Sequence, residues 1–385
     1  MFFSDFDNDL LLRQLSGNRL TVLYRLTGDE NTAYSKAKDI CTEQTVEFPD
    51  SLLPEGAIAD QIVGKIEDFR NEKENSFLAA VSYAEEDAAG EFTQFLNVVF
   101  GNISIKRGIQ VAGLVPGKNL LKIFPGPKFG IGGLRKILEI PQRPPLFTAV
   151  KPMGLSAAGL AKLTAQFAEG GIDIIKDDHG LSNQVFAPFE ERVKRCAEAV
   201  GEANVRFNRK AVYVPNISAP FEELFDRVHR AKELGAGGVM ISPGLTGFDT
   251  LRALAAAETG LPIIAHPTFL GSYVMDHSQG ISSGVLFGTL MRLAGADATI
   301  FPNYGGRFPL TPDDCLEIVN ACRSEQEDMP KIFPCPAGGM ELKNIPDMLR
   351  HYGKDILILI GSGLFRLGND LIANIRQFRE LIAKE

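Results

Sequence analysis

The sequence lacks the features that mark membrane proteins, nucleic-acid-binding proteins and disulfide-rich secreted proteins. Its 385 residues carry a formal net charge of −8 and contain no basic run, which argues against a nucleic-acid surface. No apolar stretch reaches the roughly 18 residues that a membrane span needs, and the chain turns acidic at Asp5 without the basic region of a secretory signal. The five cysteines are widely spread and form no C-x-x-C pair, so we expect a reduced, cytoplasmic protein without structural zinc.

From about residue 131 the sequence alternates between short β-rich runs and amphipathic helical patterns. The β-rich runs predict eight strands, at residues 146–152, 172–178, 211–218, 237–243, 262–267, 298–303, 331–337 and 356–361. The segments between them have the i, i+3, i+4 apolar spacing of helices, as in 156–171, 221–236 and 313–324. Eight strands alternating with helices predict an α/β protein with a closed (β/α)8 TIM barrel. An open doubly wound sheet is the alternative, although no G-x-G-x-x-G follows the first strand.

The first 125 residues have a different pattern, which predicts a small α+β domain of ferredoxin-like type with an antiparallel sheet. The strand candidates are residues 21–26, 77–84 and 95–105, and residues 31–44 are a helix candidate. Residues 124–133 read FPGPKFGIGG, and their two prolines and four glycines indicate a boundary. We therefore expect an amino-terminal domain of residues 1–125 and a barrel domain of residues 126–385.

Polar and ionisable residues follow most of the predicted barrel strands. Catalytic groups of such barrels lie at the carboxyl ends of the strands, where this sequence has Lys151, Lys176-Asp177-Asp178-His179, Asn216, His266 and Asn303. Adjacent carboxylates repel each other, so Asp177 and Asp178 need a compensating cation. Side chains alternate along a strand, so Lys176 and Asp178 share one face while Asp177 points to the other. The alternative is that Lys176 simply pairs with a neighbouring carboxylate.

Glycine-rich turns follow the last two predicted strands, at Gly338-Gly339 and at Gly361-Ser362-Gly363. Backbone N–H groups can approach an anion closely where no Cβ intervenes, and barrel enzymes often bind phosphate at these two turns. We expect a phosphate site here, although either motif alone indicates no more than a turn. His266 ends the fifth predicted strand and is expected to act in the site, with a buried core histidine as the alternative.

Several longer motifs resemble the RuBisCO large chain. They are TAVKPMGLS (148–156), GGIDIIKDD (170–178) and FPGPKFGI (124–131), together with CTEQTVEFP (41–49) and VFGNISI (99–105). Their order and spacing agree along nearly the full length. The resemblance implies an α+β amino-terminal domain, a (β/α)8 barrel and an obligate homodimer. In that dimer the active site forms between the barrel of one subunit and the amino-terminal domain of the other.

The resemblance also implies roles for individual residues. Lys176 matches the lysine that the family carbamylates with CO₂, and Asp178 matches a ligand of Mg²⁺, which prefers such oxygen donors. Lys151 matches an acid/base near the enolised carbon, and His266 matches a histidine that contacts substrate. The remaining matches bind phosphate or reach the site of the partner subunit: Gly338, Gly339, Gly361 and Ser362 on the phosphate turns, and Glu43 and Asn102 in the amino-terminal domain.

The sequence also departs from the carboxylating members of that family. Met153 stands where they have a second lysine, His179 where they have a third, glutamate metal ligand, and Ala337 where they have a serine. The predicted sixth strand lacks their histidine, and the following loop, PNYGGRFPLT, offers only Arg307 in place of a lysine that polarises CO₂. These losses exclude a working carboxylase. The chain therefore resembles the RuBisCO-like, or form IV, proteins.

The retained residues fit Mg²⁺-dependent enolisation of a phosphorylated keto compound. Our first specific expectation is S-methyl-5-thioribulose-1-phosphate isomerase activity in methionine salvage. The alternatives are a diketo-methylthiopentyl-phosphate enolase, a decarboxylase or transcarboxylase/hydrolase of a branched oxo-acid phosphate such as 3-oxoisoapionate 4-phosphate, and an inactive regulatory or binding protein. His179 is either a metal ligand or a proton shuttle, because hard ions prefer oxygen while imidazole titrates near neutrality.

Overall fold

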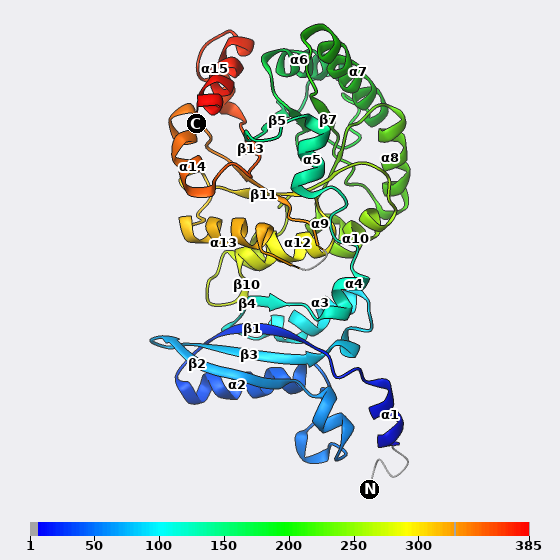
Figure 1. Cartoon of the computed structure of the whole chain (residues 1–385), viewed down its shortest axis with the longest axis vertical. Coiled ribbons are helices and arrows are strands. Elements are labelled where there is room, and N and C mark those ends of the chain that lie inside the picture. Colours follow the sequence, from blue (N-terminus) through cyan, green and yellow to red (C-terminus); the bar gives the residue numbers. More distant parts are fainter. Residues whose placement is uncertain (1–6, 327–328, 385) are drawn as a thin grey trace. The chain divides into compact units, whose positions relative to one another are not determined.

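The structure is a computed structural model that describes residues 7–326 and 329–384. By its internal contacts the chain divides into two compact units, whose elements are labelled in Figure 1. The first unit comprises the residues up to Pro125 together with Gly271–Leu286, and the second comprises Gly126–Leu270 and the chain from Phe287 onward. The segment Gly271–Leu286 thus belongs with the first unit by its contacts. The boundary between two domains at residues 125 and 126 remains our proposal.

Within its described residues, the first unit contains a five-stranded sheet in the order β10-β4-β1-β3-β2. Its strands are β1 (Arg19–Thr27), β2 (Lys65–Lys73), β3 (Ser76–Ala84), β4 (Ile109–Val115) and β10 (Gly280–Ile281). The first four pair antiparallel, which is the sheet type predicted, although β2 and β4 were not among the predicted strands; β10 runs parallel to β4. The helices are α1 (Asn8–Gln14), α2 (Glu30–Glu43), α3 (Phe92–Phe100), α4 (Lys118–Ile123) and α11 (Gly271–Val274).

One face of this sheet forms the core of the first unit. Alternate residues of β1 are fully buried, which is the pattern of a strand with one face against a helix layer. Helix α2 packs against β1, β2 and β3, and the Tyr24 hydroxyl of β1 donates a hydrogen bond to the carbonyl of Val99 in α3 at 2.8 Å. Short helical turns join these elements, at Asp50–Leu52, Ile58–Ile62, Glu85–Ala88 and Asn102–Ile105.

The predicted strand at residues 95–105 is wrong. Helix α3 occupies Phe92–Phe100, and a single 3-10 turn follows at Asn102–Ile105. The buried residues Phe92, Phe95, Val98 and Val99 recur at helical spacing, although the run is rich in residues that favour strands. Packing of this apolar face against the core therefore decides the local conformation, over the intrinsic preference of the residues.

The second unit is a barrel of eight parallel strands, counted within the described residues, and this confirms the predicted (β/α)8 fold. The strands are β5 (Leu146–Val150), β6 (Ile174–Asp177), β7 (Val212–Val214), β8 (Val239–Ile241), β9 (Ile263–Ala265), β11 (Ala298–Pro302), β12 (Phe333–Ala337) and β13 (Ile358–Leu359). Each lies inside one of the eight predicted runs. The order β7-β6-β5-β13-β12-β11-β9-β8 is closed into a ring by a bridge between Asn216 and Met240.

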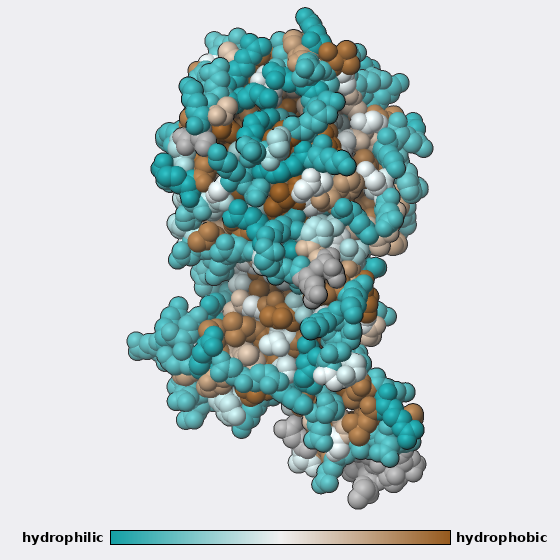
Figure 2. Space-filling model, in the orientation of Figure 1, coloured by the Kyte–Doolittle hydropathy of each residue, from teal (hydrophilic) through white to brown (hydrophobic). Residues whose placement is uncertain are grey.

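Helices surround this ring of strands (Figure 1). They are α6 (Ala157–Gly170), α7 (Phe189–Phe207), α8 (Phe221–Glu233), α9 (Pro243–Thr246), α10 (Phe248–Ala256), α12 (Met291–Leu293), α13 (Pro312–Arg323), α14 (Ile345–Tyr352) and α15 (Leu371–Lys384), with a wider helical segment at Gly284–Leu290 before α12. Helix α5 (Gly130–Leu138) instead lies across one end of the ring and packs against its core (Figure 1). Hydrophilic side chains cover most of the visible face, with apolar residues between them (Figure 2).

Local sequence signals set the ends of several of these helices. Ser156 caps α6 by accepting a hydrogen bond from the N–H of Gly159, and Gly171 ends that helix with a φ of 105° that favours glycine. Thr311 and Asp314 form a reciprocal capping box at the start of α13. These caps fix where α6 and α13 begin, after the loops that follow β5 and β11.

The barrel interior is filled by apolar side chains from alternate positions of the strands. The cluster includes Phe147, Ile174, Val214, Met240 and Ile264, and residues of α5 close it from the amino-terminal end of the strands. Because side chains alternate, the residue two positions after each of these also points inward, near the carboxyl end of its strand. For Ile174 and Ile264 those residues are Lys176 and His266.

Asp87, in the turn Glu85–Ala88, predicts a pH-dependent stability. Its Oδ2 atom is buried without a hydrogen-bond partner among the described residues, and burial raises the pKa of Asp87 to about 7. The folded state therefore holds this proton more tightly than the unfolded state, so stability falls as the pH rises from about 4 to about 7. Asp87→Asn should stabilise the protein at pH 8 by roughly 1–3 kcal/mol and should change little at pH 4.

Urea denaturation at the two pH values measures this difference. Asp60→Asn is the control, because Asp60 is an exposed carboxylate of the same unit and its neutralisation should leave the midpoint unchanged at both pH values. A gain of equal size at pH 4 and pH 8 would contradict the proposed cost of ionising Asp87.

Candidate active site

The sequence Lys176-Asp177-Asp178-His179 lies at the carboxyl end of strand β6. Lys176 and Asp177 are the last two residues of the strand and both are buried, with 2% and 0% of their surface exposed. Lys176 shares the inward face of Ile174, while Asp177 points to the helices outside. The strand therefore sends neighbouring charged side chains to opposite sides of the barrel wall.

Lys176 is a buried amine held by a neutral acceptor. Its Nζ donates a hydrogen bond to the backbone carbonyl of Asp177 at 2.9 Å. Burial, together with the nearby Lys151 ammonium, lowers the pKa of Lys176 to about 8. A substantial fraction of this amine is therefore neutral slightly above neutral pH, and a neutral amine is the form that can attack CO₂.

Lys151, Asp178, His179 and His266 converge beside Lys176 at the mouth of the barrel. Lys151 Nζ lies 2.8 Å from Asp178 Oδ1, and His179 Nδ1 lies 3.4 Å from the same oxygen. The rings of His179 and His266 stack with centroids 4.6 Å apart and an angle of 15° between their planes. Burial alone would raise the pKa of Asp178, but its contacts with His179 and Lys151 hold that pKa well below the usual range. Asp178 is thus an ionised carboxylate at the centre of the cluster.

His266 is held as a neutral imidazole. Burial and the nearby charge of Lys176 lower the pKa of His266 well below its ordinary value. Its Nδ1 accepts a hydrogen bond from the backbone N–H of Thr268 at 3.2 Å and lies 2.7 Å from the Thr268 hydroxyl. An Nδ1 that accepts an N–H carries no proton, so the proton of the neutral ring is on Nε2. The sequence did not single out Thr268, two residues after His266, as the residue that fixes this tautomer.

Asp177 is a structural residue, as its expected outward orientation suggested. It accepts hydrogen bonds from Arg192 Nε at 3.1 Å, from the Tyr213 hydroxyl and from the N–H of Asn216 at 3.1 Å. Burial alone would lower the pKa of Arg192, but the Asp177 carboxylate raises it, so the guanidinium keeps its charge. Burial raises the pKa of Asp177, and the contact with Arg192 opposes that rise. Arg192 and Tyr213 were not recognised from the sequence, because a helical arginine and a strand tyrosine carry no local signal of this pairing.

The glycine turn after β12 lies next to the loop that follows β11, and the turn after β13 approaches Met340, which follows the β12 turn. Gly338 and Gly339 have φ values of 92° and 74°, in the region that favours glycine. A Cβ on Gly306 would lie 2.9 Å from the Gly338 carbonyl oxygen, so these two loops approach closely. A Cβ on Gly361 would meet no atom within 4 Å, and Ser362 is exposed. The backbone at Gly361 and Ser362 therefore has open space beside it.

Arg307 comes directly after the close approach of Gly306. Its side chain is exposed, and the guanidinium carbon lies 5.0 Å from the ring centroid of Phe308. The structure therefore places Arg307 on the loop beside the glycine turns, and no hydrogen bond anchors it there among the described residues. A phosphate-binding role for Arg307 stays a prediction.

Glu43 and Asn102 lie together in the first unit. Asn102 Nδ2 donates to Glu43 Oε1 at 3.2 Å, and Lys106 Nζ lies 2.7 Å from Glu43 Oε2. Hydrogen bonds from Lys106 and Asn102 lower the pKa of Glu43, so it is an ionised carboxylate. The two residues predicted to reach the site of a partner subunit therefore form one polar cluster, and that role remains a prediction.

Within the described residues, no set of three or more His, Cys, Asp or Glu side chains is arranged to hold a metal ion. Asp178 offers one carboxylate and His179 one imidazole in the cluster. Lys176 would add oxygen donors only as a carbamate, and its burial and lowered pKa suit that modification. The residues present thus fit a divalent cation on condition that Lys176 is carbamylated.

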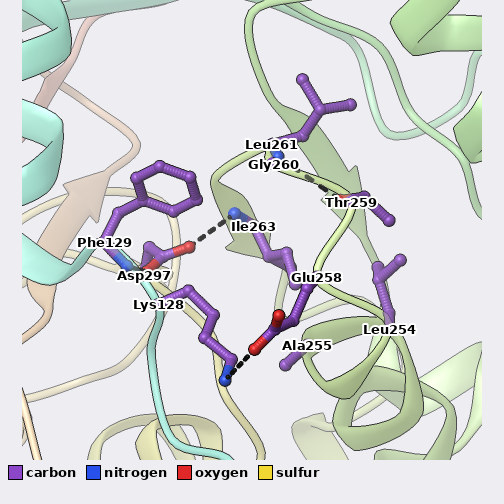
Figure 3. Close-up of a pocket in the computed structure, with 10 residues that line it drawn as sticks. All are labelled: Lys128, Phe129, Leu254, Ala255, Glu258, Thr259, Gly260, Leu261, Ile263 and Asp297. Carbon is purple, nitrogen blue, oxygen red and sulfur yellow. Dashed lines mark hydrogen bonds and ion pairs between the residues drawn. The ribbon is translucent and has the colours of Figure 1, made fainter.

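A separate cavity of about 150 Å³ lies at the opposite end of the barrel (Figure 3). Ile263, which begins β9, and Asp297, which precedes β11, both line it. Asp297 accepts hydrogen bonds from the N–H groups of Phe129, Gly130 and Ile263. These contacts hold the segment before α5 against the barrel, so this end stabilises the fold, while the ionisable cluster lies at the carboxyl ends of the strands.

The comparisons with known proteins place the chain in one family, with relatives that match 95% of its length. Residues 130–305 match the family model described as the ribulose bisphosphate carboxylase large chain, catalytic domain. Ribulose bisphosphate carboxylase-like protein 1 of Rhodopseudomonas palustris is 36% identical over 95% of this chain and 98% of its own. The 5-methylthioribulose-1-phosphate isomerase of Rhodospirillum rubrum is 34% identical over 95% of this chain and 96% of its own.

The fold agrees with these similarities. The crystal structure of a Rubisco-like protein from Rhodopseudomonas palustris superimposes with a TM-score of 0.85 at 34% identity, over 95% of this chain and 98% of that one. The expected replacements at Met153, His179 and Ala337 stand at the mouth of the same barrel. The chain belongs to the RuBisCO-like (form IV) branch of the RuBisCO large-chain family.

Proposed function

We propose that this protein is an enzyme that moves a proton on a phosphorylated keto sugar and does not fix CO₂. The first specific substrate that we propose is S-methyl-5-thioribulose 1-phosphate, which the enzyme would isomerise. The observation that carries the proposal is the convergence of Lys151, Lys176, Asp178 and His266 at the mouth of the barrel. The similarity to the Rhodospirillum rubrum isomerase over almost the full length of both chains supports this choice of substrate.

A Mg²⁺ ion is the proposed cofactor, held by Asp178 and by a carbamate on Lys176. Carbamylation joins the neutral Nζ to the carbon of CO₂ and releases one proton, which converts a cation into an oxygen ligand. When bound, the ion would stabilise the negative charge that develops on the carbonyl oxygen of the substrate. His179 is a further candidate ligand, since its Nδ1 already lies 3.4 Å from Asp178 Oδ1.

The chain's own residues supply the remaining chemistry. The Lys151 side chain is partly exposed at the mouth, where its neutral amine form can take a proton from a carbon next to the carbonyl group, and its ammonium form can return one. Neutral His266 has its Nδ1 engaged with Thr268, so its Nε2–H is the atom that can donate to a substrate oxygen. The glycine turns after β12 and β13 would bind the phosphate through backbone N–H groups.

The proposed lack of carboxylation follows from the residues that replace those of carboxylases. Met153 places an uncharged side chain, 55% exposed, near the site. Asn303, at the end of β11, accepts a hydrogen bond from the Tyr352 hydroxyl at 2.7 Å and is buried. Neither group can supply the positive charge that the carboxylation of an enolised sugar needs.

We also propose a cytoplasmic homodimer. Large apolar side chains are exposed in many of the segments that follow the barrel strands: Met153, Val185, Phe186, Phe269 and Phe308 on loops, Phe221 at the start of α8 and Phe365 in a helical turn. Such exposure around a mouth favours its coverage by another chain. No helix in the described ranges has the length and apolarity needed to cross a membrane. None of the five cysteines, all within the described residues, forms a disulfide, which supports a reducing compartment.

Product analysis tests the proposed reaction. The purified protein with Mg²⁺ and bicarbonate should convert S-methyl-5-thioribulose 1-phosphate into an isomer of unchanged mass, which NMR can identify. Release of CO₂ from a branched oxo-acid phosphate, without that isomerisation, would replace the isomerase with the decarboxylase. A conversion of diketo-methylthiopentyl phosphate alone would replace it with the enolase.

Asp178→Asn should weaken Mg²⁺ binding by at least 10–100-fold, because the variant loses a charged oxygen ligand. Isothermal titration with Mg²⁺ in bicarbonate buffer measures the affinity directly. Asp177→Asn is the matched control on the other face of the strand, and it should reduce stability while retaining most of the Mg²⁺ affinity. Equal loss of affinity in the two variants would contradict the assignment of Asp178 as the ligand.

A further inference from the structure

Asn216 follows strand β7 at the mouth of the barrel, a position where catalytic side chains are common. It is buried, with 2% of its surface exposed, and both of its amide hydrogens are used. Nδ2 donates to the carbonyl of His179 at 3.0 Å and to the carbonyl of Leu181 at 2.9 Å, while Oδ1 accepts from the N–H of Ser218 at 3.1 Å. With its donors and acceptor engaged, the side chain has little capacity left for a substrate.

These contacts fix the segment that carries the proposed metal ligands. The carbonyl oxygens bound by Asn216 belong to His179 and to a residue two positions further on, so the amide spans the turn that begins at Asp178. The N–H of Leu181 closes the same turn onto the carbonyl of Asp178 at 3.0 Å. A displacement of this turn would move the Asp178 carboxylate and the His179 ring together.

Residues on the outer face of strand β6 also bind the turn that follows Asp178. The backbone N–H of Asn216 donates to Asp177, which also binds Arg192, and the Arg192 Nη2 group donates to the carbonyl of Ser182 at 2.7 Å. Asn216 is therefore the link between the structural ion pair on the outside of the barrel and the ionisable cluster inside. Positioning groups of this kind typically change metal affinity by 10–100-fold when they are removed.

We propose that Asn216 is a positioning residue that holds Asp178 and His179 in the geometry needed for cation binding and proton transfer. The proposal rests on the function proposed above. It assigns no contact between Asn216 and the substrate. Substitution of Asn216 should change the Mg²⁺ affinity and the rate of proton transfer but not the affinity for phosphate. Strand β7 lies four strands away from β12 around the eight-stranded ring, so Asn216 lies opposite one of the phosphate turns.

The test compares Asn216→Ala with Asn204→Ala. Asn204 is an amide of α7 that binds the N–H and the carbonyl of Ala211, before the amino-terminal end of the same strand β7. Both variants lose hydrogen bonds from a side-chain amide to the backbone, so both should be less stable. Only Asn216→Ala should bind Mg²⁺ 10–100-fold more weakly, as read from Mg²⁺ titration of the melting temperature in bicarbonate buffer. The affinity for inorganic phosphate should stay the same in both variants.

Asn216→Ser is the conservative variant, because the serine hydroxyl retains one hydrogen-bond donor. It should bind Mg²⁺ more tightly than Asn216→Ala does. If Asn216→Ala does not fold, Asn216→Ser takes its place in the comparison. Wild-type Mg²⁺ affinity in the Asn216 variants, or an equal loss in Asn204→Ala, would overturn the proposal. A wild-type protein that binds Mg²⁺ in an Asn216-dependent way but moves no proton on any phosphorylated ketose would contradict the proposed function alone.

Discussion

Lys176→Ala should abolish Mg²⁺-dependent proton transfer, lowering its rate by at least about 1,000-fold. Stabilisation of a developing oxyanion is worth several kcal/mol, and each 1.36 kcal/mol corresponds to a factor of ten in rate. The variant removes the amine that would become the carbamate ligand. Only Asp178 and His179 of the proposed metal ligands then remain. Lys176→Met keeps the volume of the side chain and should show the same loss, which separates chemistry from packing.

A second readout follows the carbamate itself. Wild-type protein in ¹³C-bicarbonate should show a carbamate resonance that Mg²⁺ strengthens, and neither Lys176 variant should show it. Lys162→Ala is the matched control, because Lys162 is exposed on α6 of the same unit, and this variant should retain both the resonance and the rate. Proton transfer at the wild-type rate in Lys176→Met would contradict the carbamate assignment.

Arg192→Met should destabilise the barrel by about 3–5 kcal/mol, because it leaves the Asp177 carboxylate buried without its cation. Both side chains of this ion pair are fully buried, and Arg192 also donates to the carbonyls of Ala187 and Ser182. The melting temperature should fall by roughly 10 °C. The loss should be largest near neutral pH, since protonation of Asp177 in acid removes the unpaired charge.

Arg195→Met is the control on the same helix α7. Arg195 pairs with Glu191 at 2.8 Å on the surface, with both side chains about half exposed, and such pairs contribute at most about 1 kcal/mol. The double variant Asp177→Asn/Arg192→Met should regain part of the stability lost in Arg192→Met, because it removes the uncompensated charge. Equal melting temperatures for Arg192→Met and Arg195→Met would show that the buried ion pair contributes no more to stability than the exposed one.

The barrel could be predicted from the sequence because its signals are local. Each strand lies in a short, mostly apolar run, the longer helices have apolar residues at helical spacing, and α6 and α13 begin at side-chain caps. The first unit was harder to predict. Strand β2 reads KIEDFRNEK and was not expected, because an edge strand needs few apolar residues and is protected by charge. Helix α3 was expected to be a strand, since a short apolar run fits either structure until its packing partner is known.

The candidate site was predictable to the extent that it follows from strand alternation. The opposite orientations of Lys176 and Asp177 follow from a period of two residues. The partners that fix the site could not be predicted in the same way. Thr268 beside His266, and Asn216 beneath the turn after Asp178, act through atoms that only the folded chain brings together. The sequence therefore indicated the ionisable side chains of the site, while the structure shows the hydrogen-bond partners that fix their positions.

Deuterium exchange is the most direct test of proton transfer at this site. In D₂O with Mg²⁺ and bicarbonate, the wild-type protein should introduce deuterium at a carbon next to the carbonyl group of S-methyl-5-thioribulose 1-phosphate. Removal of Mg²⁺ with EDTA should stop the exchange. When the bicarbonate is isotopically labelled, its carbon should not appear in any stable product. Absence of exchange with this and other phosphorylated ketoses and oxo acids, in the presence of Mg²⁺ and bicarbonate, would contradict the account.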